Sequence, residues 1–306
     1  MDLNDNIKQE YKSVTQIAQE WKITTRAVRN YCQEGMIPGV QKIGKMWLIP
    51  ENARKPIRME SKRKKKGLLK ALEIEMKKGI DDGIYHGFVI DATFNTFKLE
   101  GGKLSREQVR YMHDDKSLSL GGNILDVDEI IEMSNHFRCL DFIIKTAKKD
   151  LDEKYIKKLF FMLENSTDVI ENFTSKNSCY KKSENKFNEI ETVKPENVEK
   201  EIKILLDEYN SKENVELDDV LYLLHRFMMI SPFSISNGKI ARLIVLKECL
   251  KNRIVPFLIE EDMSVFYLRG IEKWKEEPSI LKNITLVAQE KFSSYLEYFG
   301  IKYNNI

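Results

Sequence analysis

The sequence has few cysteines and histidines, and neither kind is grouped as a disulfide framework or a metal site requires. The chain of 306 residues contains four of each, and no two cysteines form a CxxC pair. They are Cys32, Cys139, Cys179 and Cys249, and His86, His113, His136 and His225. Scattered thiols are typical of reduced proteins inside the cell. We therefore expect a cytoplasmic protein with no metal site built from these residues.

Long apolar runs and proline are also missing. No stretch is apolar over enough residues to span a bilayer, and the polar N-terminal segment MDLNDNIKQEYK lacks the apolar part of a secretory signal. No proline occurs between 57 and 194, where apolar residues recur mostly at helical spacing. We expect a mainly α-helical protein with no membrane partner.

Charge is balanced overall but not locally. The formal net charge is +2. Residues 1–66 carry 15 Lys and Arg against 7 Asp and Glu, a net charge of +8, and the remainder carries 35 against 41, a net charge of −6. A basic module on an acidic body indicates that the module binds a polyanion. A merely solvated basic surface is the alternative.

The basic module has the pattern of two short helices and a hairpin. In VTQIAQEWK, one helical face consists of Val14, Ile17, Ala18 and Trp21. After the turn KIT, the segment TRAVRNYCQEG forms a second helix, which Gly35 is expected to end. The segment MIPGVQKIGKMWLIP then alternates as a hairpin turning near Gly44 and Lys45. Two helices across a tight turn form a helix-turn-helix.

Residues 12–56 resemble the winged helix-turn-helix of the MerR/excisionase class, which binds DNA. In that class the second helix enters the major groove and the hairpin, or wing, contacts the backbone. The resemblance implies DNA contacts by Thr24, Thr25, Arg26, Arg29, Asn30, Lys42 and Lys45. Arg and Asn can pair with guanine and adenine edges. A homodimer is expected, because two half-sites multiply affinity. A small domain used only for protein contacts is the alternative.

The domain organisation follows from these patterns. We predict a DNA-binding domain over 1–58, a basic linker over 59–67 and a helical body over 68–306. The linker is solvated because its lysines repel one another, and it can also contact phosphates. In the body, helical patterns cover 67–79, 82–102, 105–112, 127–149, 152–166, 194–210, 216–230 and 240–252. The polar segment 170–195 is predicted to be an exposed loop or hairpin.

The loop SPFSISNGKIAR, residues 231–242, has the composition of an anion-binding site. It lies between two predicted helices, and Asn237 and Gly238 open the second. A helix N-terminus presents free N–H groups and a partial positive charge. Lys239 and, one turn later, Arg242 add two cations. The residues therefore predict a cradle for an anion, although they do not identify a phosphate.

The segment LLHRFMMISPFSISNGKIARLIV resembles the signature of the Fic/Doc (Fido) family, His-Pro-Phe-x-Asp/Glu-Gly-Asn-Gly-Arg-x-x-Arg. The matching residues are Pro232, Phe233, Asn237, Gly238 and Arg242. The family transfers a nucleotide monophosphate, typically AMP from ATP, to a protein hydroxyl. The resemblance implies an all-helical Fic domain with a small β-hairpin flap, at about 175–195, that docks a protein target. Nucleotide binding is implied for Phe233, Asn237, Gly238, Lys239 and Arg242.

A second motif of that family has a counterpart in TFKLEGG at 96–102. The family's inhibitory motif is Ser/Thr-x-x-x-Glu-Gly/Asn, whose glutamate pairs with the last motif arginine. The matching residues are Thr96, Glu100 and Gly101, on an inhibitory helix at about 82–100. The resemblance therefore predicts an ion pair between Glu100 and Arg242.

The loop departs from the family signature where catalysis depends on it. Ser231 replaces the histidine that acts as general base, and a hydroxyl does not accept a proton at pH 7 as an imidazole does. Ile235 replaces the acidic ligand of Mg²⁺ and offers no oxygen. Lys239 replaces an arginine and loses its two-pronged phosphate grip. His225 lies about 9 Å away along the helix axis and is predicted to be packed or exposed rather than a substitute base.

Three functions are compatible with these residues. The first is a DNA-binding transcriptional regulator whose degenerate Fic domain binds a nucleotide or another anion, with weak or no transferase activity. The second is a protein adenylyltransferase, with Ser231 in place of the histidine and Glu100 as inhibitor. The third is a scaffold whose flap captures a protein partner. ATP is the expected ligand of the loop, while Ile235 places Mg²⁺ or Mn²⁺ binding in doubt.

Overall fold

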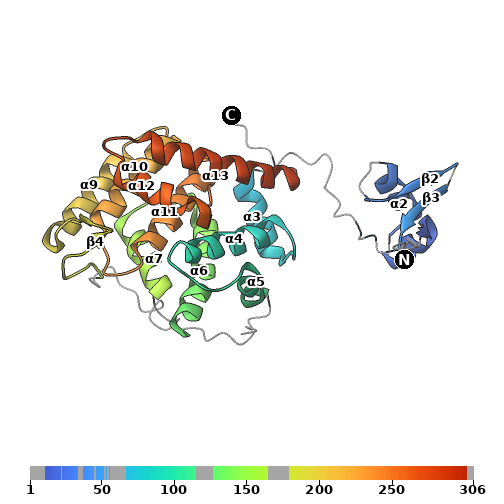
Figure 1. Ribbon diagram of the computed structural model, residues 1–306, viewed down its shortest axis with the longest axis horizontal. Helices are drawn as coiled ribbons and strands as arrows, with labels where there is room; N and C mark the ends of the chain where they lie inside the picture. Colours follow the sequence, from blue (N-terminus) through green and yellow to red (C-terminus); the bar gives the residue numbers. More distant parts are fainter. Residues whose placement is uncertain are drawn as a thin grey trace, which may run out of the picture. The chain divides into compact units, whose positions relative to one another are not determined.

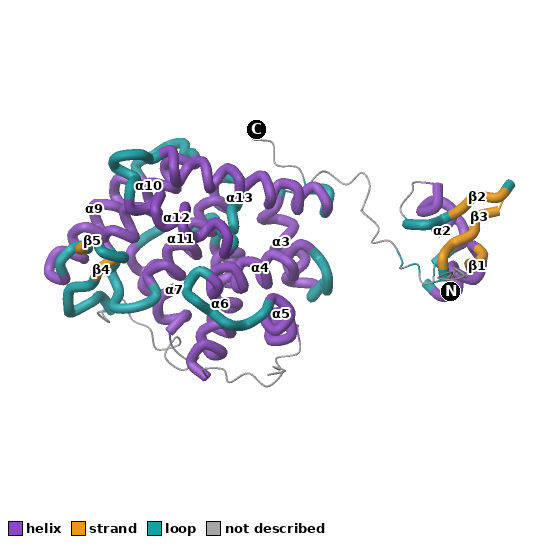
Figure 2. The backbone as a smooth tube through the Cα atoms, in the orientation of Figure 1, coloured by secondary structure: helices purple, strands orange, loops and turns teal. Residues whose placement is uncertain are grey.

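The computed structural model describes residues 11–21, 23–33, 37–44, 46–51, 53, 55, 67–114, 127–164 and 179–301. The chain divides into two compact units, residues 1–63 and 64–306. The structure is mainly helical, as the sequence predicts, and has two small β-sheets (Figures 1 and 2). Within the described ranges, no helix combines the length and apolarity needed to cross a bilayer. Gly35, Lys45 and the predicted linker, except Gly67, fall outside the described residues.

The first unit packs two short helices with a three-stranded antiparallel sheet. The helices are α1 (Val14–Glu20) and α2 (Thr25–Gln33), and the strands are β1 (Tyr11–Ser13), β2 (Gln41–Ile43) and β3 (Met46–Pro50) in the order β1-β3-β2. Strand β1 was not predicted, because three residues are too few for a visible alternation. Its pairing with β3 places Lys12 opposite Ile49. Both helices contribute to one small core, in which Ile17 and Val28 are completely buried.

The start of α1 is fixed by a reciprocal cap. The Ser13 hydroxyl accepts a hydrogen bond from the Gln16 N–H at 3.3 Å, and the Gln16 side chain accepts one from the Ser13 N–H at 2.8 Å. This capping box satisfies two amide groups that have no partner inside the helix. It makes β1 run directly into α1.

The second unit is an assembly of helices with one small hairpin. Its α-helices are α3 (Leu68–Lys78), α4 (Ile84–Lys98), α5 (Arg106–Asp114), α6 (Val127–Thr146), α7 (Glu153–Glu164), α9 (Val198–Asn210), α10 (Leu217–Ile230), α11 (Asn237–Asn252), α12 (Ser264–Glu272) and α13 (Ser279–Tyr298). The hairpin pairs β4 (Lys186–Phe187) with β5 (Ile190–Glu191). Short 3₁₀ turns, η1 (Pro195–Asn197) and η2 (Glu261–Met263), precede α9 and α12. The eight predicted helical segments of the body all form helices.

Helix α11 lies at the centre of the second unit (Figure 1) and contacts α3, α4, α6, α7 and α10. Every side chain from Leu243 to Leu250 is buried, so the helix is enclosed on all sides. Two of those side chains, Lys247 and Glu248, are charged and form an ion pair at 2.5 Å with no exposed surface on either side chain. The loop at the start of α11 is therefore carried by the most enclosed helix of the unit, which holds it in place.

Candidate functional site

The loop between α10 and α11 has a conformation that its own side chains hold. Ser231 ends α10 with a left-handed backbone, φ +46°, and Ser236 precedes α11 with φ +59°. Such angles are uncommon outside glycine. The Asn237 side chain stabilises this backbone conformation with two hydrogen bonds. It accepts one from the Phe233 N–H at 2.9 Å and donates one to the Phe233 carbonyl at 2.8 Å. The Phe233 ring is fully buried and stacks on Phe160 with centroids 4.1 Å apart. The loop is thus locked at both ends.

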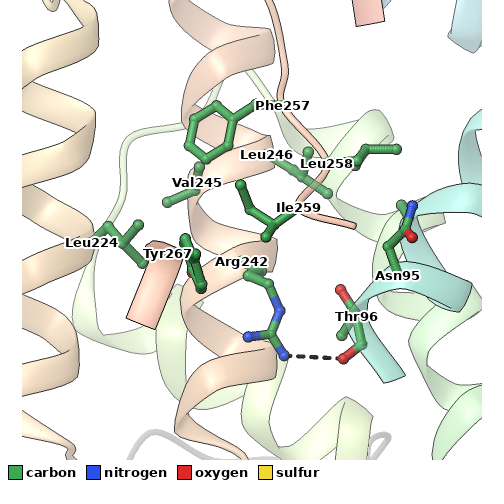
Figure 3. Close-up of a pocket in the computed structure, with 11 residues that line it drawn as sticks. Asn95, Thr96, Leu224, Arg242, Val245, Leu246, Phe257, Leu258, Ile259 and Tyr267 are labelled. Carbon is green, nitrogen blue, oxygen red and sulfur yellow. Dashed lines mark hydrogen bonds between the residues drawn. The ribbon is translucent and has the colours of Figure 1, made fainter. Parts of the chain in front are cut away.

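Glu100 and Arg242 form the ion pair predicted from the inhibitory motif. The Arg242 guanidinium donates to a Glu100 carboxylate oxygen at 2.6 Å and to the Thr96 carbonyl at 3.3 Å, the bond drawn in Figure 3. Helix α4 covers 84–98 of the predicted 82–100, so Glu100 lies in the turn that follows it. The next residue, Gly101, has φ +83°, which lets the chain reverse there.

The Glu100 carboxylate occupies the start of α11 itself. A Cβ atom placed on Gly238 would lie 2.6 Å from the Glu100 Oε1 atom and 3.1 Å from the Arg242 guanidinium. Burial alone would raise the pKa of Glu100, but the charge and hydrogen bond of Arg242 outweigh it and hold that pKa below its ordinary value of 4.5. The predicted anion cradle is therefore filled by an anion of the same chain.

A second carboxylate neutralises the other cation of the loop. Glu132 of α6 lies 2.9 Å from the Lys239 ammonium and accepts a hydrogen bond from the Ser236 hydroxyl at 3.0 Å. The ammonium also lies 5.3 Å from the centre of the Phe97 ring. Sequence reasoning missed Glu132, because one glutamate among the charged residues of an amphipathic helix carries no distinguishing signal.

The loop does not offer the ligands that Mg²⁺ prefers. Ile235, where the resemblance predicts an acidic ligand, has 56% of its surface exposed and its side chain supplies no oxygen. Glu132 is already engaged by Lys239 and Ser236. Burial raises the pKa of Glu164, another acid near Ser236, which weakens it as an anionic ligand. The residues present therefore do not match a Mg²⁺-nucleotide site at this loop.

Neither Ser231, His225 nor His136 offers the loop an effective general base. Ser231 is buried, and its hydroxyl is 3.4 Å from the Asn185 amide nitrogen. His225 is packed, as predicted, with Nδ1 2.8 Å from the Ile271 carbonyl, and burial lowers its pKa. His136 of α6 is closer to the two loop cations. Burial and the charges of Arg242 and Lys239 lower the pKa of His136 to about 3, so it is neutral but a poor base at pH 7.

The predicted flap at 175–195 is described from residue 179 onward, and it contains the β4–β5 hairpin. Its base is joined to the loop by backbone hydrogen bonds, from the Lys181 N–H to the Pro232 carbonyl at 2.8 Å and from the Val193 N–H to the Met229 carbonyl at 3.2 Å. The Lys181 ammonium is buried and donates to the Ile230 carbonyl at 3.2 Å, which satisfies the C-terminus of α10. Sequence reasoning did not find this contact.

The cavity behind Arg242 is too small for a nucleotide. Its volume is about 20 Å³, room for roughly one water molecule, whereas ligand pockets measure about 300–1,000 Å³. Figure 3 shows Tyr267 of α12 and Leu224 of α10 on the side of the guanidinium away from Thr96. We therefore expect an anion to reach Arg242 from the Gly238 side, where Glu100 lies.

Most of the residues predicted to contact DNA lie on α2 or β2 of the first unit. On α2, Arg26, Arg29 and Asn30 are exposed, while Thr24 just before the helix is exposed and Thr25 is half-buried. Lys42 of β2 is exposed and lies 5.1 Å from the centre of the Trp47 ring. Lys45 lies outside the described residues. Five of the seven predicted contact residues are therefore exposed in the described part of the first unit: Thr24, Arg26, Arg29, Asn30 and Lys42.

Comparisons with solved structures identify the fold of the helical unit. A Fic-domain-containing signalling protein from Bacteroides thetaiotaomicron matches with a TM-score of 0.54 and 22% identity, over 76% of this chain and 93% of that one. Fic-1 from C. elegans matches with a TM-score of 0.59 and 12% identity, over 76% and 72%. A Fic family protein from Desulfovibrio desulfuricans matches with a TM-score of 0.57 and 15% identity, over 75% and 72%.

Matches over three quarters of the chain lie mostly in the helical unit, because the first unit holds residues 1–63 only. At these identities the likeness establishes the fold and leaves the activity open. No family model matches the sequence, and no curated protein matches it.

Proposed function

We propose that this protein is a DNA-binding regulator whose Fic-fold unit binds an anionic ligand without transferring a nucleotide efficiently. One observation carries the proposal: both cations of the loop are paired with carboxylates of the same chain. Arg242 is paired with Glu100 and Lys239 with Glu132. A phosphate must displace at least one of these carboxylates before it contacts a cation. Without a ligand, the site is therefore blocked by two carboxylates.

Transfer would also lack two chemical groups. A general base typically contributes about 10²–10⁴ to a rate, and the buried Ser231 does not supply one. A divalent metal offsets the charge that develops on a transferred phosphoryl group. Ile235 does not bind such a metal. Ligand binding survives these losses better than transfer does, because the helix N-terminus and Arg242 are retained.

The basic first unit supports the DNA-binding part of the proposal. Arg26 and Arg29 are three residues apart on α2, and both are exposed. Among the described residues, neither arginine forms an ion pair, whereas Lys12 is paired with Glu20 and Glu51. Unpaired guanidinium groups on one helix face are available to phosphates and guanine edges.

A second candidate, a slow protein adenylyltransferase, is favoured by the preserved frame of the loop. The two hydrogen bonds between Asn237 and Phe233 and the Glu100–Arg242 ion pair are both present. An inhibitory contact is most useful where there is an activity to restrain. In this alternative, loss of Glu100 opens the cradle and Ser231 orients the target hydroxyl.

Label transfer from α-labelled ATP distinguishes the two functions. The full chain is incubated with Mg²⁺ and with Mn²⁺ as wild type, Glu100→Gly, and Glu100→Gly combined with Ser231→His. The regulator predicts no incorporated label in the first two, and none or little in the third. Label on Glu100→Gly that disappears when Arg242→Ala is added would establish the enzyme instead.

DNA binding is tested separately with the full chain and a mixed-sequence duplex at several salt concentrations. Fluorescence anisotropy should show binding at low salt that weakens steeply as salt increases, because bound cations release counterions from the phosphates. A lack of binding at low salt would contradict the regulator, whatever the transfer assay gives.

A further inference from the structure

Two histidines and an aspartate meet at the junction of α4 and α5, away from the loop. His86 lies near the start of α4, and His113 and Asp114 end α5. His86 Nε2 is 2.5 Å and His113 Nδ1 is 2.9 Å from the same Asp114 oxygen, Oδ1. The three ligand atoms all lie within 4.8 Å of one another. The sequence predicted no such grouping, because 26 residues separate the two histidines and only the fold brings them together.

We propose that His86, His113 and Asp114 bind one divalent transition-metal ion of the zinc type. Two imidazole nitrogens and one carboxylate oxygen are one of the common sets of three protein ligands for such an ion, and a water molecule completes the tetrahedron. Mg²⁺ and Ca²⁺ prefer sets made of oxygen only. The donor set therefore selects zinc-type ions.

The residues that contact the three ligands also match those found around metal sites. Arg110 Nε donates to the other carboxylate oxygen of Asp114, Oδ2, at 3.3 Å, which leaves Oδ1 directed at the histidines. The Arg110 guanidinium is itself 3.2 Å from Asp82, so its charge is partly offset. Partners of this kind orient ligating carboxylates in metal sites. The Phe137 ring, 5.0 Å from the His113 ring, provides an apolar wall.

A small movement of Asp114 would make room for the ion, and a water ligand would reach it from solvent. Ligands about 2.0–2.2 Å from a tetrahedral metal are about 3.3 Å from one another, so Asp114 would move away from the two nitrogens by less than about 1 Å. The side chain of Asp114 is 29% exposed and that of His113 is 22% exposed, so this movement and the fourth ligand are both accessible from solvent. His86 is more deeply buried and anchors the site.

The ion would clamp α4 to α5. Helix α4 leads into the turn that carries Glu100. The bound ion would therefore stabilise the helix that positions the Glu100 carboxylate against Arg242. This inference does not depend on whether the loop binds a nucleotide, and it can be tested without any activity assay.

The test uses the full chain after treatment with a chelator, titrated with ZnCl₂ by calorimetry and with CoCl₂ by visible absorption. We expect one ion per chain, the visible bands of tetrahedral Co²⁺, and a higher Tm in Zn²⁺. His113→Ala and Asp114→Asn should each weaken binding by more than about tenfold and abolish the Tm increase. Both variants are checked by circular dichroism without metal, and Asp114→Asn keeps the shape of the site if His113→Ala fails to fold.

Two control variants show whether the binding belongs to this cluster. Asp150→Asn removes a carboxylate that is 85% exposed, is paired with Lys251 and does not belong to the cluster, and this variant should bind Zn²⁺ like wild type. Cys179→Ser removes the one cysteine that is not buried and should also leave binding unchanged. No stoichiometric Zn²⁺ binding, equal affinity in Asp114→Asn, or a thiolate-to-Co²⁺ charge-transfer band would each overturn the proposal.

Discussion

Glu132 of α6 and Lys239 of α11, 107 residues apart in the chain, form an ion pair 2.9 Å long beside the loop that opens α11. The pair stands next to that of Glu100 and Arg242, whose atoms are 2.6 Å apart. Helix α6 and the turn after α4 thus each contribute one carboxylate. The positive charge that the loop would offer a phosphate is already balanced before any ligand arrives.

Removing both carboxylates should open the loop to polyphosphate. We expect Glu100→Gly and Glu132→Gln each to raise the affinity of the full chain for ATP by about tenfold, and the double variant to bind tightest. A charge-assisted hydrogen bond contributes about 1.5–3 kcal/mol, and 1.4 kcal/mol corresponds to a factor of ten. Calorimetric titration with ATP and with inorganic triphosphate measures the effect.

Glu201→Gln is the matched control for this experiment, because it breaks an ion pair with Arg226 at 3.0 Å, away from the loop. It should leave ATP affinity unchanged. If the double variant binds no better than wild type, the two carboxylates do not close the site and the proposed role of the loop is wrong.

His136 should make the protein sensitive to acid. Its ordinary pKa of 6.5 falls to about 3 in the folded state, so between these values the unfolded chain binds a proton that the folded chain does not. The free energy of unfolding should therefore decrease as the pH falls from 6.5 towards 3, by up to about 1.4 kcal/mol per pH unit from this residue.

His136→Gln should flatten the stability profile in that window. Urea unfolding of both proteins at pH values from 8 to 4 gives the comparison, and the difference at pH 8 gives the cost of lost packing, including the contact with Thr93 at 2.9 Å. Parallel profiles for the two proteins would mean that His136 is protonated in the folded state after all.

The buried pair Lys247–Glu248 should be costly to break and less costly to replace. Lys247→Met or Glu248→Gln leaves a charged partner without an exposed surface, and such changes typically cost about 3–5 kcal/mol. The combined variant Lys247→Met with Glu248→Leu should cost less than the sum of the two single changes, although it leaves the Tyr209 hydroxyl, 3.0 Å from Glu248, without that partner. Chemical denaturation measures all three. Additive losses would show that the two charges are not coupled.

Arg26 and Arg29 should carry DNA affinity that Lys12 does not. Alanine at either arginine should weaken duplex binding by about 1–3 kcal/mol if it reads a base, or lower the salt dependence by about one ion if it contacts phosphate. Lys12→Ala is the control, since that lysine is already paired with Glu20 and Glu51. Anisotropy titrations at three salt concentrations separate the outcomes. Equal loss in all three variants would indicate a diffuse basic surface without a reading helix.

The agreement between sequence and structure is strongest where a local pattern suffices. Helices α3, α4, α6, α10 and α11 follow from apolar residues at helical spacing, and the β2–β3 hairpin follows from alternation around Gly44. Strand β1 escaped notice because three residues form no period, and its place depends on the partner strand β3. The Glu100–Arg242 pair was predicted only because two motifs resembled those of one family.

The sequence by itself determined the helical character of this protein, its basic first unit and the chemistry of residues 231–242, because these depend on residue types and on spacing within one element. Only the tertiary structure decided which charges meet. Glu132 reaches Lys239, and His86 reaches His113 and Asp114, through the packing of helices distant in the chain. Periodicity shows which face of a helix is buried, but it does not show which neighbouring helix covers that face.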